Sequence, residues 1–394
     1  MKLILPNDIN EARFLSEFWQ KKPLLMPGAL PEYRSPLTPD ELAGLACDED
    51  IESRLVLEKD GSRPWEARTG PFDEQDFASL PESHWTLLVQ DVDKHIPEVA
   101  ELLNPFRFLP DWRLDDIMIS YAVDQGSVGP HIDDYDVFLV QARGKRRWMI
   151  HTRDVSEEDY IPGLDLRILP EFEAEYDWIM EPGDVLYLPP NVAHWGIAQD
   201  DECMTCSVGF RAPTFQEMAV AWCDELISTQ VPKSRFRDGK LGVQTANAEI
   251  LPDALERMRN ELNQFLNTEP SHQERWFGRF ITEPKAHLQV MPPDNHTNPD
   301  ELYTLFKTDG LLERDGWSRM AFIRGHESED FLYAGGEEYP LEKSHDGFIQ
   351  WITGNRILKF SDAAPWITSR DCLNLLAVLF NDGHLTRHQE RDES

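Results

Sequence analysis

Short apolar runs, separated by turns rich in Pro, Gly and Asp, recur through the first half of the chain. Little helical periodicity lies between these runs, which is the pattern of a β-sandwich or a β-barrel. One amphipathic helix precedes them, DINEARFLSEFWQKK, and Asp8 is its predicted N-cap. The predicted strands are WTLLVQ, DIMISYAV, DVFLVQA, RRWMIH, DVLYLPP and MTCSVGF.

The hydrophobic period changes after residue 212. Apolar residues then recur at the three- and four-residue spacing of amphipathic helices, which predicts a helical region over 213–291. Apolar helix faces of this kind favour a small bundle or a homodimer. The two faces consist of Phe215, Met218, Ala219, Trp222 and Leu226, and of Leu255, Met258, Leu262, Phe265 and Leu266.

A Pro- and Asn-rich break, MPPDNHTNPDE, precedes a third region over 292–394. Its pattern of a helix, two strands and two further helices resembles a winged-helix module. Such modules often bind DNA, but this one carries the acidic segments HESED, GGEEY and RDES. A structural or protein-contact role is therefore favoured over DNA binding. The sequence predicts three domains, 1–212, 213–291 and 292–394.

The charge of the chain restricts its partners. Seventy-two acidic residues against 38 basic ones give a net charge of −34. Direct nucleic-acid binding is disfavoured because phosphate contacts need a basic surface. A basic protein partner is favoured, and an adaptation of the surface to solubility or salt explains the charge equally well.

No apolar run approaches the roughly 18 residues of a membrane span. The apolar patch at the start of the chain, before Pro6, is too short for the core of a secretory signal. We therefore expect a cytoplasmic protein with no membrane association.

Five cysteines are scattered along the chain. Cys203 and Cys206 form one C-x-x-C without a second pair, which disfavours a structural zinc site. If this segment is a strand, residues three apart point to opposite faces. Buried free thiols are therefore favoured over a redox or zinc role.

The segment GPHIDDYDVF places His131 two residues before Asp133. In an extended chain both side chains project to the same face. A third candidate ligand, His194, follows the turn, strand and Pro-Pro stop of EPGDVLYLPPNVAHWGIA. Two histidines and one carboxylate form the facial triad that holds Fe(II) and leaves open positions for a cosubstrate and oxygen. An ordinary polar turn and a satisfied histidine at a strand end are the alternatives.

A cosubstrate anchor is predicted at Arg146. In RGKRRWMIH, Arg146, Trp148 and Ile150 share one face of a strand. A guanidinium inside a barrel is costly unless it meets an anion, and a dicarboxylate such as 2-oxoglutarate would satisfy it through two hydrogen bonds. Ser120, on DIMISYAV, could donate to the same carboxylate. The alternatives are a structural ion pair for Arg146 and an inert hydroxyl for Ser120.

The combination of GPHIDDYDVFLVQARGKRRW with EPGDVLYLPPNVAHWG resembles the JmjC-type 2-oxoglutarate oxygenases. Among them, the chain looks most like the bacterial ribosomal oxygenases that hydroxylate an arginine of a large-subunit ribosomal protein, number sixteen of that subunit. FWQKKPLL, LPDWRLDDIMIS and SVGFRAPT extend the likeness over roughly residues 8–220. The two later regions match the layout of that family more loosely.

The resemblance implies a mainly β fold with α-helices: a double-stranded β-helix (the cupin or JmjC jelly roll), then a helical dimerisation region and a winged-helix-like domain. It implies His131, Asp133 and His194 as catalytic iron ligands, with 2-oxoglutarate and O2 as cosubstrates. It implies Arg146 as the anchor of the distal carboxylate, assisted by Ser120. The segment GIAQDDECMTCSV departs from the expected pattern, because it carries Thr-Cys where polar or aromatic pocket residues are expected.

The substrate pocket is a further hypothesis. Asp116 shares a strand face with Met118 and Ser120, and Tyr135 has the parity of Asp133 if that strand is regular. Asp116 would then engage the target guanidinium while Met118 and Tyr135 line its aliphatic stem. Surface solvation is the alternative role for Asp116.

Alternative functions are hydroxylation of a histidine, demethylation of an N-methylated side chain, a non-catalytic cupin-like binding protein and a DNA-binding regulator. The intact set of three ligands and Arg146 disfavours the binding protein, and the acidic third region disfavours the regulator. Purified protein could also carry nickel, cobalt, zinc or manganese at the iron ligands.

Overall fold

The structure is a computed structural model that describes residues 1–388 apart from 7, 60–64, 153–159, 162–165, 212, 231–232, 234, 239–241, 245, 247 and 326–328. The chain divides into two compact units, Met1–Ala212 and Pro213–Ser394. The predicted boundary near residue 291 lies inside the second unit, and the three-domain division stays a prediction.

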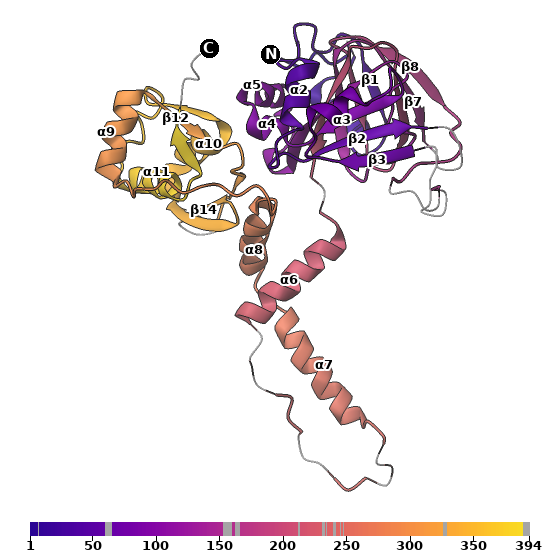
Figure 1. Cartoon of the computed structure of the whole chain (residues 1–394). Coiled ribbons are helices and arrows are strands. Elements are labelled where there is room, and N and C mark those ends of the chain that lie inside the picture. Colours follow the sequence, from indigo (N-terminus) through magenta and orange to yellow (C-terminus); the bar gives the residue numbers. More distant parts are fainter. Residues whose placement is uncertain are drawn as a thin grey trace. The chain divides into compact units, whose positions relative to one another are not determined.

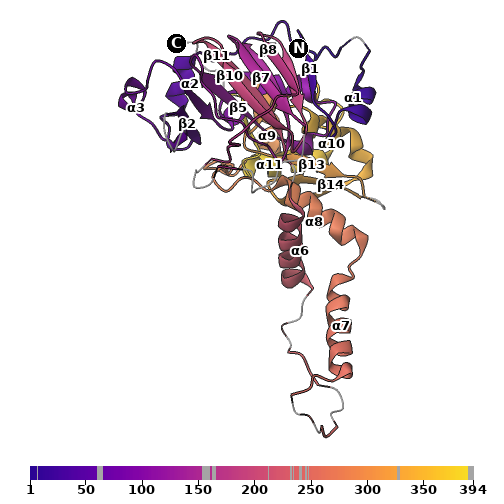
Figure 2. The ribbon, with the colours of Figure 1, turned by 90° about the vertical axis from the view of Figure 1, so that its right-hand side faces the viewer.

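The first unit is a two-sheet β-sandwich (Figure 1). Its larger sheet has the strand order β1-β9-β6-β11-β5-β4-β2-β3, and its smaller sheet has the order β10-β7-β8 (Figure 2). Every paired strand of this unit is antiparallel to its neighbour. The strands are β1 (Leu24–Met26), β2 (Ser53–Glu58), β3 (Trp65–Thr69), β4 (Trp85–Val89), β5 (Leu114–Ala122), β6 (Asp136–Arg143), β7 (Arg146–His151), β8 (Tyr176–Met180), β9 (Val185–Leu188), β10 (Ala193–Ala198) and β11 (Cys203–Phe210).

Short helices accompany the larger sheet. They are α1 (Glu11–Glu17), α2 (Pro39–Leu45), α3 (Glu74–Ala78), α4 (Val92–His95), α5 (Pro97–Ala100) and the 3₁₀ turns η1 (Glu101–Phe106) and η2 (Asp111–Arg113). The predicted cap of the first helix was wrong. Asn10, not Asp8, is the N-cap, and its side chain accepts the N–H of Arg13. Asp8 instead forms an exposed ion pair with Arg13.

Both faces of the central strands are buried, which explains their continuous apolar runs. On β6, Val137 and Leu139 join a cluster with Trp148 and Ile150 of the smaller sheet. Phe138, one residue later than Val137, faces the opposite side and packs in the cluster that includes the helices. The alternation of one strand therefore supplies the layer between the sheets and the layer under the helices.

The second unit begins with three helices, α6 (Phe215–Thr229), α7 (Pro252–Leu266) and α8 (Pro270–Thr282). The winged-helix part follows, with its own core between helices and strands. Four strands that the sequence pattern had not indicated, β12, β15, β16 and β17, complete its sheets. Its elements are α9 (Pro299–Asp309), β12 (Leu311–Arg314), β13 (Met320–Ile323), β14 (Glu329–Ala334), β15 (Glu337–Glu342), η4 (Lys343–His345), α10 (Asp346–Gly354), β16 (Ile357–Lys359), α11 (Arg370–Asn381) and β17 (Leu385–Arg387).

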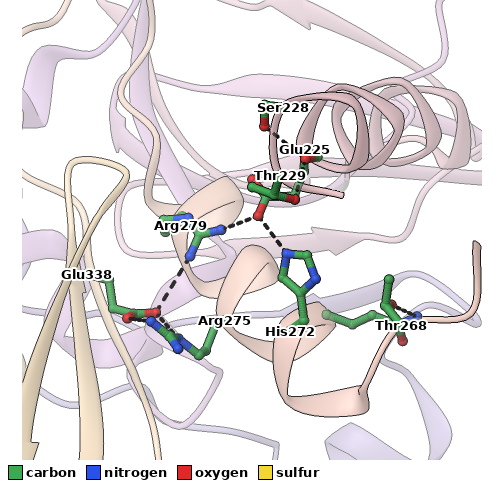
Figure 3. A network of polar contacts seen from close by, with 9 residues as sticks. Glu225, Ser228, Thr229, Thr268, His272, Arg275, Arg279 and Glu338 are labelled. Carbon is green, nitrogen blue, oxygen red and sulfur yellow. Dashed lines mark hydrogen bonds and ion pairs between the residues drawn. The ribbon is translucent and has the colours of Figure 1, made fainter. Parts of the chain in front are cut away.

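A polar network joins α6, α8 and β15 (Figure 3). Glu225 of α6 accepts hydrogen bonds from His272 and Arg279 of α8, each over 2.8 Å. Arg275 and Arg279 also pair with Glu338 of β15. The network fixes α6 to α8 and α8 to β15 within this unit.

No helix within the described part of the chain is long and apolar enough to cross a membrane.

Candidate active site

The two candidate histidines meet where the ends of two sequence-distant segments lie side by side. His131 and His194 form an isolated antiparallel bridge, with their ring centroids 4.3 Å apart. Nδ1 of His131 lies 2.9 Å from the carbonyl oxygen of Gly129, and Nδ1 of His194 lies 2.9 Å from that of Val192. A carbonyl oxygen only accepts, so each Nδ1 carries the proton and each Nε2 is left with a lone pair for a metal.

Asp133 completes the cluster. Its carboxylate oxygens lie 3.9 Å from Nε2 of His131 and 3.5 Å from Nε2 of His194. One ligand atom of each residue lies within 4.8 Å of the others, a spacing that one ion could bridge. Two imidazole nitrogens and a carboxylate suit a divalent transition metal with open coordination positions.

The side chains of His131 and Asp133 converge, but the structure assigns no strand that contains both, so their shared strand face stays a prediction. Beyond the single bridge at His131, no strand is assigned to the described residues before β6, which begins at Asp136. The carbonyl oxygen of Asp133 instead accepts the N–H of Asn191, a residue with φ of 64° after the Pro-Pro stop. The loop therefore places Asp133 through a backbone contact with the turn that precedes His194.

His194 is 2% exposed. Burial, with a further contribution from the neighbouring His131, lowers its pKa to about 4. The imidazole is therefore neutral at pH 7, which is the form that binds a metal.

Arg146 is a buried cation without a carboxylate partner among the described residues. It is 5% exposed. Its Nη1 donates to the hydroxyl of Ser120 over 3.3 Å, and its Nε donates to the sulfur of Cys203 over 3.2 Å. Its Nη2 is buried and has no hydrogen-bond partner among the residues described. Among the described residues no structural ion pair satisfies Arg146, and a bound anion would satisfy the free nitrogen.

A cavity of about 450 Å³ connects these groups. His131, Asp133 and His194 line it together with Arg146 and Ser120. The cavity therefore joins the candidate metal ligands to Arg146. This volume suits a small-molecule ligand.

The predicted substrate residues lie at or beside the same cavity. Met118 and Tyr135 line it. The Tyr135 side chain is 43% exposed, and partial burial together with the carboxylates of Asp133 and Asp116 raises its pKa. Asp116 is outside the lining, and its Oδ2 accepts the N–H of Asp91 over 3.2 Å.

Several residues at the site had no role assigned from the sequence pattern, among them Ser207, Trp148 and Cys203. Ser207 of β11 lines the cavity opposite Met118 in the strand register. Trp148 lines it too, and its buried Nε1 has no partner among the described residues. The sulfur of Cys203 accepts a hydrogen bond from Nε of Arg146. Strand alternation in MTCSVGF would have found Cys203 and Ser207, which are four residues apart with the same parity.

The chain is similar to known proteins along most of its length. A JmjC domain model matches residues 101–218, and a ROXA-like winged-helix model matches residues 259–386. The chain is 36% identical over 376 residues to the ribosomal protein uL16 3-hydroxylase of Escherichia coli, covering 95% of this chain and 97% of that protein. It is 33% identical over 341 residues to a probable ribosomal oxygenase of Haemophilus influenzae, covering 84% and 83%.

A solved structure extends the likeness to three dimensions. The E. coli ribosomal oxygenase YcfD, in complex with cobalt and 2-oxoglutarate, matches with a TM-score of 0.80 at 34% identity, covering 98% of each chain. The similarity therefore includes both the sandwich and the second unit.

Proposed function

Because the chain belongs to the JmjC-domain ribosomal oxygenases, we propose that it hydroxylates an arginine of the ribosomal protein uL16. The chain is a 2-oxoglutarate-dependent oxygenase of this family. The E. coli relative is a uL16 3-hydroxylase, which supports uL16 as the substrate. The choice of arginine rests on the carboxylate of Asp116 beside the cavity.

His131, Asp133 and His194 would hold Fe(II) through two Nε2 atoms and a carboxylate oxygen. The hydrogen bonds at both Nδ1 atoms support this assignment, because they orient the rings and leave each Nε2 unprotonated. The same donor set accepts cobalt, nickel, zinc or manganese, so the metal of purified protein would not by itself report activity.

Arg146 would bind the distal carboxylate of 2-oxoglutarate, and Ser120 would assist. The single observation that carries this function is the buried, unpartnered Nη2 of Arg146 beside the cavity that the three metal ligands line. A cation buried without a counter-ion is costly unless a ligand supplies the opposite charge. When bound, Fe(II) with 2-oxoglutarate and O2 supplies the oxidation, which converts a C–H of the substrate into C–OH and 2-oxoglutarate into succinate and carbon dioxide.

The protein residues would orient the substrate for that oxidation. The Asp116 carboxylate would pair with the target guanidinium, while the apolar surfaces of Met118 and Tyr135 would enclose the stem of the side chain. The N–H of Asp91 on Oδ2 of Asp116 supports this role, because it fixes one oxygen and orients the carboxylate.

We also propose that the chain forms a homodimer through α6 and α7. Leu262 and Leu266 of α7 are 52% and 54% exposed, and Phe215 of α6 is 88% exposed. Apolar surface of this extent on helices supports a protein interface. Light scattering should give twice the chain mass, and Leu262→Glu should shift the protein toward the monomer; an unchanged dimer would contradict this interface.

The substrate class supports a cytoplasmic location, and the net charge of −34 supports a basic protein as partner rather than a nucleic acid.

The test is direct incubation of the purified chain with uL16, Fe(II), 2-oxoglutarate and O2, followed by tandem mass spectrometry. We expect the mass of one oxygen atom on a single arginine of uL16 and none without 2-oxoglutarate. Oxygen on a histidine, or no modification of uL16, would contradict the proposed substrate residue. Ribosomal proteins from the host with and without the gene provide the second comparison.

A further inference from the structure

We propose that Cys203 is a positioning residue for 2-oxoglutarate. Its sulfur accepts the Nε–H of Arg146 and thereby fixes the guanidinium with Nη2 available for the distal carboxylate of the cosubstrate. This inference rests on the proposed role of Arg146. It assigns to this chain a cosubstrate-orienting thiol at the segment where the sequence departs from the expected pattern.

The guanidinium is held across the sandwich. Arg146 extends from β7 of the smaller sheet, whereas Cys203 on β11 and Ser120 on β5 belong to the larger sheet. The sulfur of Cys203 accepts a hydrogen bond from Nε of Arg146 over 3.2 Å, and the hydroxyl of Ser120 accepts one from Nη1 over 3.3 Å. Two of the three nitrogens are therefore engaged from the opposite sheet, and only Nη2 has no partner in the described structure. Because a guanidinium is planar, two fixed nitrogens determine the direction of the third.

The sulfur is itself fixed. Gln141 donates from Nε2 to the sulfur of Cys203 over 3.5 Å and to the carbonyl oxygen of Arg143 over 2.7 Å. The Oε1 of Gln141 accepts from the hydroxyl of Thr205 over 3.1 Å. A buried chain of hydrogen bonds from β6 and β11 therefore ends at Cys203.

A thiol suits this position because it accepts without adding charge. Cys203 is fully buried in a small cluster with Ala122 and Ala198, and no carboxylate of the described residues pairs with Arg146. Arg146 therefore keeps its whole positive charge for the anionic cosubstrate. An aspartate in place of Cys203 would neutralise the guanidinium and compete with 2-oxoglutarate.

Cys206 provides a matched control. It lies on the same strand and is equally buried, but its sulfur contacts the hydroxyl of Tyr33 at 3.3 Å on the opposite face. Cys206→Ala therefore removes a buried thiol of β11 without touching Arg146.

The test measures equilibrium binding to the full chain loaded with Mn(II) under anaerobic conditions, by calorimetry. The two probes are 2-oxoglutarate and 2-oxobutanoate, which keeps the metal-chelating 2-oxo acid but lacks the distal carboxylate. We expect Cys203→Ala to raise the Kd for 2-oxoglutarate about fivefold, the effect of one lost hydrogen bond, and to leave the Kd for 2-oxobutanoate unchanged. Cys203→Ser, whose hydroxyl can accept the same N–H, should recover most of the affinity, and Cys206→Ala should match wild type.

The outcomes separate this inference from the proposed function. Wild-type protein that does not bind 2-oxoglutarate would overturn the proposed function. Wild type that binds 2-oxoglutarate while folded Cys203→Ala binds it equally well would overturn the role of Cys203, as would equal losses for both probes. If Cys203→Ala does not fold, Cys203→Val, which fills the site without accepting a hydrogen bond, decides by the same criterion. In turnover with Fe(II), the KM for 2-oxoglutarate should rise while kcat stays unchanged.

Discussion

His131 and His194 exchange both of their backbone hydrogen bonds, with N···O distances of 3.0 and 2.9 Å. The two candidate ligands are therefore fixed to each other by the main chain rather than by side-chain packing alone. Asp133 lies on the loop that follows, and its backbone is tied to Asn191. Such an arrangement holds the donor atoms in place before an ion binds, which reduces the entropic cost of metal binding.

Removal of the carboxylate should abolish metal binding. Asp133→Ala leaves two imidazoles but removes the only anionic donor of the cluster. We expect the affinity for Co(II) to fall about 100-fold or more, because loss of a supporting group alone costs ten- to 100-fold. Calorimetry with Co(II) measures the change. Asp134→Ala is the control, since Asp134 is the adjacent residue and forms an exposed ion pair with Arg167; equal losses in both variants would contradict the assignment.

The contact between Gly196 and Trp148 predicts a second effect. These residues face each other across β10 and β7, and a Cβ on Gly196 would lie 2.7 Å from the Trp148 ring. Gly196→Ala must displace a buried ring that lies next to the guanidinium of Arg146. We expect a loss of about 1–3 kcal/mol in unfolding free energy and a higher KM for 2-oxoglutarate.

Urea denaturation and steady-state kinetics measure these two quantities. Gly44→Ala in α2, where a Cβ would meet open space, serves as the control and should be neutral or slightly stabilising. A Gly196→Ala protein as stable as wild type would show that Trp148 can move without cost.

Strand alternation predicted much of the first unit, because each strand of a closely packed sandwich carries its own burial pattern. The face shared by Asp116, Met118 and Ser120, and the inward direction of Arg146, could be derived this way. The convergence of His131 with Asp133 was predicted from a shared strand face, whereas no assigned strand contains both residues. The backbone of Asp133 is also held by a hydrogen bond from the N–H of Asn191, and no periodicity encodes such a contact.

Other features depend on contacts between elements that are distant in sequence, and the hydrophobic pattern of one segment could not predict them. The contact between Cys203 and Arg146 joins two sheets and two strands distant in sequence. Strands β16 and β17 have only three residues each, which is too short for a periodic signal. The N-cap is Asn10 rather than the predicted Asp8. Both residue types cap helices well, and only the backbone conformation decides between them.

The hydrogen bonds that Glu225 accepts should stabilise the contact between α6 and α8 (Figure 3). Glu225 is 16% exposed and bridges His272 and Arg279 of α8. Glu225→Ala removes the acceptor of the hydrogen bonds from Nε2 of His272 and Nη2 of Arg279. We therefore expect the unfolding free energy to fall by about 1–3 kcal/mol and the amides of α6 to exchange faster. Hydrogen exchange with mass spectrometry measures this. Ser228→Ala, on the exposed side of the same helix, should leave the exchange of α6 as in wild type.

Charge removal at Asp116 should separate substrate binding from cosubstrate turnover. Asp116→Asn keeps an oxygen that can accept the N–H of Asp91 but removes the charge that would pair with an arginine. We expect peptide hydroxylation to fall at least about 100-fold, as for the loss of a charged hydrogen-bonded pair. Turnover of 2-oxoglutarate without peptide should persist, since Asp116 lies outside the lining of the cosubstrate cavity. Succinate release with and without peptide measures both rates, and undiminished peptide turnover would exclude Asp116 from the substrate site.

The acidic surface should increase the rate of encounter with a basic substrate. A net charge of −34 creates a long-range field that attracts a positively charged protein, and salt shortens its reach from about 10 Å at 0.1 M to about 3 Å at 1 M. Raising the salt concentration should therefore increase the KM for full-length uL16 much more than the KM for a short, neutral peptide around the target residue. The same peptide is the control for effects of salt on the active site itself. Equal increases for the two substrates would assign the acidic surface to solubility rather than to recognition.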